Sequence, residues 1–149
     1  IFAAGCFWQP EYEFRKREGV IDTQVGYTGG HIDNPDYKVV CTGKSGHAEA
    51  VKVIYDPDHI SYHVLLQLFF SIHDPTQKDR QGLDIGHQYR SAIFYLDKDQ
   101  HEAAQQAIHD LKKQGVPVQT ELNLAETFWP AEKYHQCYLE KYMRSRFLS

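Results

Sequence analysis

The stretches VIDTQVGY (residues 20–27) and AEAVKVIY (residues 48–55) decide the fold, because both predict strands and no helix is expected between them. The first alternates polar and apolar residues with the two-residue period of a strand, and the second stops at Asp56-Pro57. Residues 28–47 hold four glycines, one proline, one asparagine and two aspartates, which is typical of a loop. Two successive strands joined by a loop, in a chain whose other strands alternate with helices, predict a split βαβ layout.

The rest of the chain alternates short strands with helices. Apolar runs or two-residue alternation predict strands at residues 2–4, 91–96 and 116–125. Helical spacing and capping residues predict helices at residues 9–18, 61–74, 99–114 and 131–147. This order predicts an α/β (α+β) protein with helices packed on one mixed sheet, a split βαβ (ferredoxin-like) core and two long functional loops. A fully parallel, doubly wound sheet is the alternative.

Length, charge and cysteine content narrow the class of protein. With 149 residues we expect one domain that spans residues 1–149. The net charge of −4 opposes a nucleic-acid partner, and no apolar run approaches the roughly 20 residues of a membrane span. Cys6, Cys41 and Cys137 are too widely spaced for a secreted disulfide framework, and the first residues lack the features of a signal peptide. We therefore expect a cytoplasmic protein that binds neither nucleic acid nor membrane.

Cys6 is the first candidate for chemistry. It follows a predicted strand and comes just before a predicted helix, in the stretch GCFW. The free N–H groups and dipole of a helix N-terminus stabilise a thiolate, which would lower the pKa of the Cys6 thiol and make it a nucleophile. Cysteine is also a common core residue, so position alone leaves the alternative of an inert, buried thiol open.

Glu49 is the second candidate, because it shares the apolar face of its predicted strand with Val51, Val53 and Tyr55. A carboxyl on such a face is costly to ionise, and desolvation raises its pKa toward the range of a general acid at neutral pH. The alternative is a glutamate at the end of a strand that reaches solvent or a salt bridge.

The loop at residues 28–47 and a second long polar loop at residues 75–90 carry further polar and aromatic candidates, namely Tyr37, Asp84, His87 and Tyr89. Tyrosine hydroxyls can donate to an oxygen, and aromatic rings can hold an apolar group. The stretch CTGKSG is not a phosphate loop, because Lys38 stands where that motif needs glycine. The sequence has no paired spacing of metal ligands, so no metal is expected.

Several motifs resemble the A-type peptide methionine sulfoxide reductases in order and spacing, from residue 2 to about residue 139. They are GCFW, GYTGG, NPDY, GHAEAV, YDP, HDPTQKDRQG, QYRSAI and AEKYHQ. The resemblance implies a two-layer α/β roll. It also implies an enzyme that reduces the S epimer of methionine sulfoxide, free or in proteins, and so repairs oxidised proteins; enzymes of this class reverse methionine oxidation one epimer each.

The resemblance also implies a role for individual residues. Cys6 matches the nucleophile that becomes a sulfenic acid, and Glu49 matches the acid. The oxygen of the sulfoxide would be held by two tyrosines, with one carboxylate in the same pocket and two aromatic residues around the methyl group. These are, in that order, Tyr37 and Tyr89, Asp84, and Phe7 and Trp8.

A thiol must then reduce the sulfenic acid. Many family members carry recycling cysteines in a glycine-rich tail, whereas the residues after Cys137 here contain no cysteine. Cys137 is the first internal candidate and Cys41 the second, and an external thiol is the alternative. The resemblance implies no bound cofactor, a thiol reductant such as thioredoxin, glutaredoxin or glutathione, oxidised proteins or peptides as substrates, and a monomer.

Two other functions compete with this interpretation. A hydrolase or acyltransferase would pair Cys6 with His47 or His87 and would need no reductant. A binding module for oxidised methionine would keep the pocket without needing Cys6.

Overall fold

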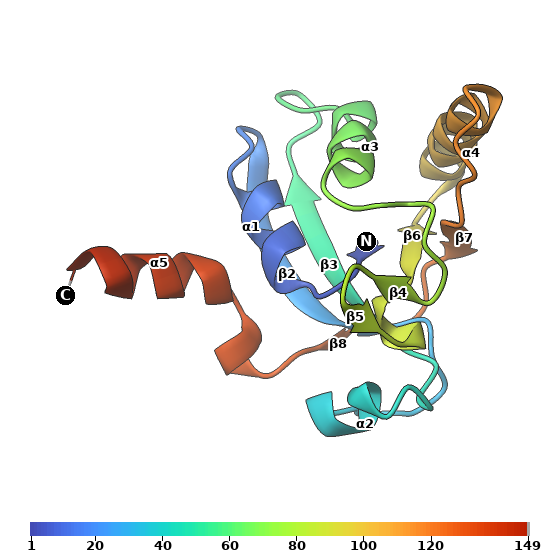
Figure 1. Cartoon of the computed structure of the whole chain (residues 1–149). Coiled ribbons are helices and arrows are strands. Elements are labelled where there is room, and N and C mark those ends of the chain that lie inside the picture. The colour runs from blue at the N-terminus through green and yellow to red at the C-terminus, as the bar shows by residue number, and fades with distance from the viewer. Residues whose placement is uncertain (149) are drawn as a thin grey trace.

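The computed structural model describes residues 1–148, with side chains up to Arg144. Within these residues, six strands form one mixed sheet in the order β7-β6-β1-β3-β2-β8 (Figure 1). All neighbouring pairs are antiparallel except β6 and β7, which are parallel. The strands are β1 (Phe2–Ala4), β2 (Val20–Thr28), β3 (Ala48–Tyr55), β6 (Ser91–Tyr95), β7 (Glu121–Leu124) and β8 (Trp129–Pro130).

The order β6-β1-β3-β2 is that of a split βαβ core, in which β3 lies between β1 and β2. The predicted mixed-sheet fold is therefore confirmed, and the fully parallel alternative is wrong. The pairing of Tyr27 with Glu49 fixes the register of β2 and β3 and brings the second predicted strand to the centre of the sheet. The strand predicted at 91–96 is central too, because β6 lies between β7 and β1.

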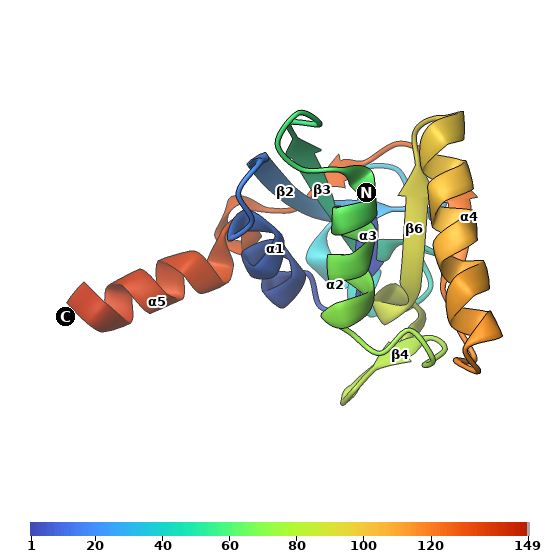
Figure 2. The same ribbon diagram turned by 90° about the horizontal axis from the view of Figure 1, so that it is seen from above.

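Three helices form the second layer: α1 (Trp8–Arg15), α3 (Tyr62–Ser71) and α4 (Lys98–Lys113). Figure 2 shows them side by side on one face of the sheet. Phe2 of β1 stacks on Phe14 of α1 and lies against Phe69 of α3, with ring centroids 5.2 and 5.3 Å apart. These three rings are at most 1% exposed and join the sheet to the helices. No helix among residues 1–148 is both long enough and apolar enough to cross a bilayer.

Both segments predicted as loops contain short elements. The first holds α2 (Tyr37–Cys41), which begins where the Asp36 side chain accepts the N–H of Val39 at 2.8 Å. The second holds a hairpin of β4 (Arg80–Gln81) and β5 (Asp84–Ile85), followed by the 3₁₀ turn η1 (His87–Tyr89). Gly82, with φ of +59°, is the first residue of the two-residue hairpin turn, a position that favours glycine.

Two predicted elements are shorter than expected. The strand predicted at 116–125 pairs only over β7, because the N–H of Gln119 donates to Pro75 O at 2.7 Å instead of to β6. The helix predicted at 131–147 is divided into the 3₁₀ turn η2 (Lys133–His135) and α5 (Tyr138–Leu148). Cys137, between them, has φ of +53°, which an α-helix cannot contain. The helix α5 contacts α1 and extends away from the sheet (Figure 1).

Candidate active site

Cys6 lies in the turn that joins β1 to α1. The preceding Gly5 has φ of +89°, and a Cβ atom there would lie 2.8 Å from the Gln81 side chain. Only glycine suits both conditions, so Gly5 allows this turn to approach the β4–β5 hairpin. Cys6 and Asp84 of the hairpin consequently line one cavity of about 370 Å³, together with Trp8 and Leu139.

Glu49 lies in the middle of the sheet and is only 1% exposed. Its Oε1 accepts the backbone N–H of Phe7, next to Cys6, at 3.2 Å. Its Oε2 is buried and has no hydrogen-bond partner among the described residues. The alternative of a glutamate that reaches solvent or a salt bridge is therefore wrong.

Burial raises the pKa of the Glu49 carboxyl to about 8, since the hydrogen bond from Phe7 offsets only part of the desolvation and the charge of Asp84 adds to it. Glu49 is therefore largely protonated at neutral pH. A protonated carboxyl with a free oxygen can donate a proton to a bound oxygen atom.

The Cys6 thiol does not have the low pKa predicted from its place before a helix. Burial raises its pKa to about 12, the hydrogen bond from the backbone of Trp8 lowers it, and the charges of Glu49, Asp84 and Cys41 raise it further. Desolvation and neighbouring negative charge thus outweigh the helix N-terminus. In the ligand-free protein the thiol keeps its proton.

Tyr37, Tyr89 and Asp84 come from three different segments, and each lies close enough to Glu49 to interact with it electrostatically. Tyr37 begins α2, Tyr89 ends η1 and Asp84 lies on β5. Burial raises the pKa of Tyr89 to about 12, and the charges of Glu49, Cys41, Asp84 and Cys6 contribute. A hydrogen bond with Cys41 and burial raise the pKa of Tyr37, with contributions from Tyr89 and Glu49. Both hydroxyls therefore remain protonated and can donate hydrogen bonds.

Phe7 and Trp8 occupy different depths. Phe7 is 1% exposed, and its ring lies 5.8 Å from that of Tyr27 and 5.2 Å from that of His135. Trp8 is half-buried and lines the cavity that contains Cys6. The indole is thus the aromatic surface that the cavity offers beside the thiol.

Two residues of the AEKYHQ motif, Glu132 and His135, belong to the site although no individual role was predicted for them. His135 is 2% exposed, and its Nδ1 accepts the Nε1–H of Trp8 at 3.0 Å. Its Nε2 has no hydrogen-bond partner in the described part of the chain. Glu132 accepts from the hydroxyl of Tyr27 at 3.0 Å and from the N–H of Tyr37 at 3.3 Å, which ties α2 to the sheet.

The two histidines considered as partners for Cys6 are engaged elsewhere. Nδ1 of His47 accepts the N–H of Gly30 at 3.1 Å, and its Nε2 contacts Ile32 O at 2.7 Å. His87 pairs through Nδ1 with Asp79 at 2.8 Å. Neither histidine lines the cavity that contains Cys6, so the structure does not bring either of them to the thiol as the base of a Cys–His hydrolase. Across residues 1–148 no three His, Cys, Asp or Glu side chains are grouped as a metal ion would require.

Known proteins resemble this chain in sequence and in fold. The family model described as peptide methionine sulfoxide reductase matches residues 1–148. A peptide methionine sulfoxide reductase MsrA of Nautilia profundicola is 55% identical over 141 residues, which cover 95% of this chain and 82% of the relative. Reduced Mxr1 of Saccharomyces cerevisiae superposes with a TM-score of 0.87 and 37% identity, over 94% of this chain and 82% of that one. Mxr1 in complex with Trx2 superposes with a TM-score of 0.62 and 26% identity, over 92% and 81%. The chain therefore belongs to the peptide methionine sulfoxide reductases, and it is an oxidoreductase that reduces methionine sulfoxide.

Proposed function

We propose that the enzyme reduces the S epimer of methionine sulfoxide, free or in oxidised proteins, and that Cys6 becomes a sulfenic acid in the reaction. The observation that carries this proposal is the buried, protonated Glu49, whose Oε2 has no partner among the described residues and whose Oε1 is bound to the backbone beside Cys6. A sulfoxide sulfur is a poor electrophile until the negative charge on its oxygen is neutralised. Glu49 supplies the proton that neutralises it.

In the proposed step, the Cys6 sulfur attacks the sulfur of the sulfoxide while Glu49 protonates the sulfoxide oxygen. The attack forms a bond between the two sulfurs. The protonated oxygen then moves to the Cys6 sulfur as the sulfur–oxygen bond of the substrate and the new sulfur–sulfur bond break, and methionine leaves. Glu49 recovers its proton from the Cys6 thiol, so the net reaction converts thiol and sulfoxide to sulfenic acid and thioether. The two electrons that reduce the sulfoxide come from the Cys6 sulfur, which is oxidised.

Three polar groups and one ring assist this step. The hydroxyls of Tyr37 and Tyr89 hold their protons and donate to the developing negative charge on oxygen. Asp84 lines the same cavity as Cys6 and accepts from polar groups of the substrate. The indole of Trp8 packs on the methyl group of the sulfoxide, and the buried ring of Phe7 lies against His135, which accepts the indole N–H.

A thiol restores Cys6 by attacking the sulfenic acid, which forms a disulfide and releases water. Cys137 is the internal candidate, because Trp8 and Leu139 border both the hollow next to Cys137 and the cavity of Cys6. Cys41 is the second internal thiol, and an external thiol is the alternative. A thioredoxin-type protein is the proposed final reductant, in keeping with the complex of Mxr1 with Trx2.

The decisive experiment follows methionine release from purified S and R epimers under single-turnover conditions. We expect the wild type to act on the S epimer only, Cys6→Ser to release no methionine, and Cys41→Ser and Cys137→Ser each to release one equivalent. Sustained turnover by Cys6→Ser, or equal rates for both epimers, contradicts the proposal. Peptide mapping after one equivalent of substrate without reductant identifies the recycling thiol: a Cys6–Cys137 disulfide supports internal resolution, and a persistent sulfenic acid supports an external thiol.

A further inference from the structure

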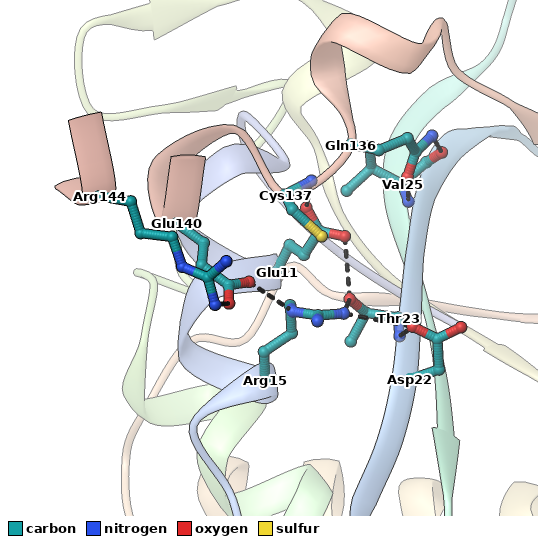
Figure 3. A network of polar contacts seen from close by, with 9 residues as sticks. All are labelled: Glu11, Arg15, Asp22, Thr23, Val25, Gln136, Cys137, Glu140 and Arg144. Carbon is teal, nitrogen blue, oxygen red and sulfur yellow. Dashed lines mark hydrogen bonds and ion pairs between the residues drawn. The ribbon is translucent and has the colours of Figure 1, made fainter. Parts of the chain in front are cut away.

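Glu11 is a buried carboxyl that the proposed reaction does not use. It is 1% exposed, and it accepts the backbone N–H of Cys137 at 2.7 Å and the hydroxyl of Thr23 at 2.9 Å (Figure 3). Glu11 follows Trp8 by three residues on α1, so both side chains lie on neighbouring positions of one helix face. A buried carboxyl that binds a backbone N–H 126 residues away fixes that segment of chain relative to α1.

Gln136 fixes the same segment to the sheet. Its Oε1 accepts the N–H of Val25 at 2.9 Å, and its Nε2 donates to Val25 O at 2.8 Å (Figure 3). The same Nε2 also donates to Ala131 O at 3.0 Å. The amide therefore pairs with both backbone groups of a β2 residue, just beyond the point where β8 pairs with Gly26. Glu11 of α1 therefore binds Cys137, and the neighbouring residue Gln136 binds Val25 of β2.

The segment from His135 to Tyr138, which we call the indole clamp, grips Trp8 at two places. Nδ1 of His135 accepts the indole N–H at 3.0 Å. The ring of Tyr138 stacks on the indole, with centroids 4.0 Å apart and planes 14° from parallel. The left-handed conformation of Cys137, at φ of +53°, lies between these two contacts and separates η2 from α5.

Ion pairs of Arg15 also connect the chain after this segment to α1 and β2. Arg15 binds Glu140 of α5 at 3.0 Å and Asp22 of β2 at 3.2 Å, and it also donates to Thr23 (Figure 3). These groups are partly exposed, so their contribution is small compared with that of the buried Glu11. Glu11 and Gln136 are therefore the contacts on which the position of the indole clamp depends.

We propose that Glu11 and Gln136 are positioning residues for substrate binding: they hold the indole clamp, and the clamp sets the plane of the Trp8 indole beside Cys6. This inference rests on the proposed function, in which the indole packs on the methyl group of the substrate. It predicts that removal of the Glu11 or Gln136 side chain lowers the affinity for the substrate, because an indole that is free to rotate presents its face to the methyl group only part of the time.

The test uses a Trp129→Phe background, which leaves Trp8 as the single tryptophan of the chain. In it, Glu11→Ala and Gln136→Ala are compared for KM, kcat and indole emission, with methionine sulfoxide as substrate and dithiothreitol as reductant. We expect each to raise KM about tenfold and kcat to change less than threefold, the pattern of lost ground-state binding. The Trp8 emission should move to longer wavelength in both as the indole gains solvent.

Two further variants separate positioning from stability. Glu11→Gln can still accept from Cys137 N–H and can donate to Thr23, so it should restore KM and emission. Thr23→Val removes the other buried hydrogen bond of Glu11 and leaves the one to Cys137, so it should lower stability with KM and emission unchanged. If Glu11→Ala does not fold, KM and emission of Gln136→Ala test the same proposal, because that variant loses the contact of the indole clamp with β2.

The proposal is overturned if Gln136→Ala leaves KM and emission unchanged, or if Thr23→Val changes both as much as Glu11→Ala does. Failure of the proposed function gives a different result, since turnover would then not depend on Cys6 or on the S epimer, while Trp8 emission would still respond to Glu11→Ala.

Discussion

Replacing Glu49 by glutamine tests the proposed proton donor and changes activity and stability in opposite directions. The amide oxygen can still accept the N–H of Phe7, and the amide nitrogen takes the place of Oε2, which has no partner among the described residues. The variant should therefore fold. It can donate a hydrogen bond to the sulfoxide oxygen but cannot transfer a proton to it. Because general acids contribute about 10²- to 10⁴-fold, we expect the rate of methionine release to fall about 10²- to 10³-fold.

The expected gain in stability follows from the pKa of Glu49. Between pH 4.5, the usual pKa of the carboxyl, and pH 7, the folded protein keeps a proton that the unfolded chain loses, because the pKa in the fold is about 8. The folded state binds more protons, so stability falls as pH rises through this range. At about 1.36 kcal/mol per pH unit, the loss of unfolding free energy reaches roughly 3 kcal/mol at pH 7. Glu49→Gln does not titrate and should recover much of it.

The assay combines two measurements on the same protein. Single-turnover methionine release isolates the chemical step from recycling, and urea unfolding at pH 5 and pH 7.5 gives the pH dependence of stability. Glu13→Gln is the matched control, because it removes a carboxylate on the outer side of α1 whose ion-pair partner is Lys16. A variant at position 49 that keeps its release rate within tenfold of the wild type refutes the role as acid. Equal pH dependence of stability in variant and wild type refutes the raised pKa.

Three other predictions follow from the same geometry. Alkylation of Cys6 by iodoacetamide in the ligand-free enzyme should accelerate with pH up to pH 10 without a plateau, since burial raises the thiol pKa to about 12; a plateau near pH 8 would contradict this. Gly5→Ala should lower the unfolding free energy by about 2 kcal/mol or more and also reduce the rate of methionine release. The new Cβ would clash with the Gln81 side chain, and alanine is strained at the Gly5 φ of +89°. Thermal melts measure the loss of stability, and the release assay measures the rate. Asp36→Ala should destabilise α2 by about 1 kcal/mol and raise KM through Tyr37, and an unchanged KM would remove α2 from the site.

Local sequence patterns correctly predicted the strands and helices that pack one face against the hydrophobic core. The two-residue period of β2 and β3 and the apolar stripe of α3 reflect burial against the same layer, so their positions could be inferred before their partners were known. The division of the last predicted helix into η2 and α5 could not be inferred from local patterns. It depends on Gln136 pairing with Val25 and on Glu11 binding Cys137, and both partners lie more than 100 residues away in the sequence.

The same distinction applies to the site. Glu49 was predicted to have a raised pKa because an apolar strand face is a local property, and its burial confirms the direction. The direction for the pKa of Cys6 was wrong because the nearby helix N-terminus is visible in the sequence, whereas the burial that raises this pKa, and the smaller effects of Glu49 and Asp84, arise only in the fold. The grip of His135 on Trp8 likewise needs the complete chain, since 127 residues separate the two.

The raised pKa values of Cys6 and Glu49 have a common consequence for the order of events. At neutral pH the empty site holds a thiol and a carboxylic acid, so neither group is charged. Methionine sulfoxide is also uncharged but has a strongly polar sulfur–oxygen bond, and it can approach these two groups without desolvating an ion at either of them. In the proposed step, Glu49 is left as a buried carboxylate once it has passed its proton to the sulfoxide oxygen. Formation of the new bond to the attacking sulfur makes the Cys6 thiol acidic, so its proton passes to Glu49 as the bond forms, and the thiol reacts only while a sulfoxide occupies the site.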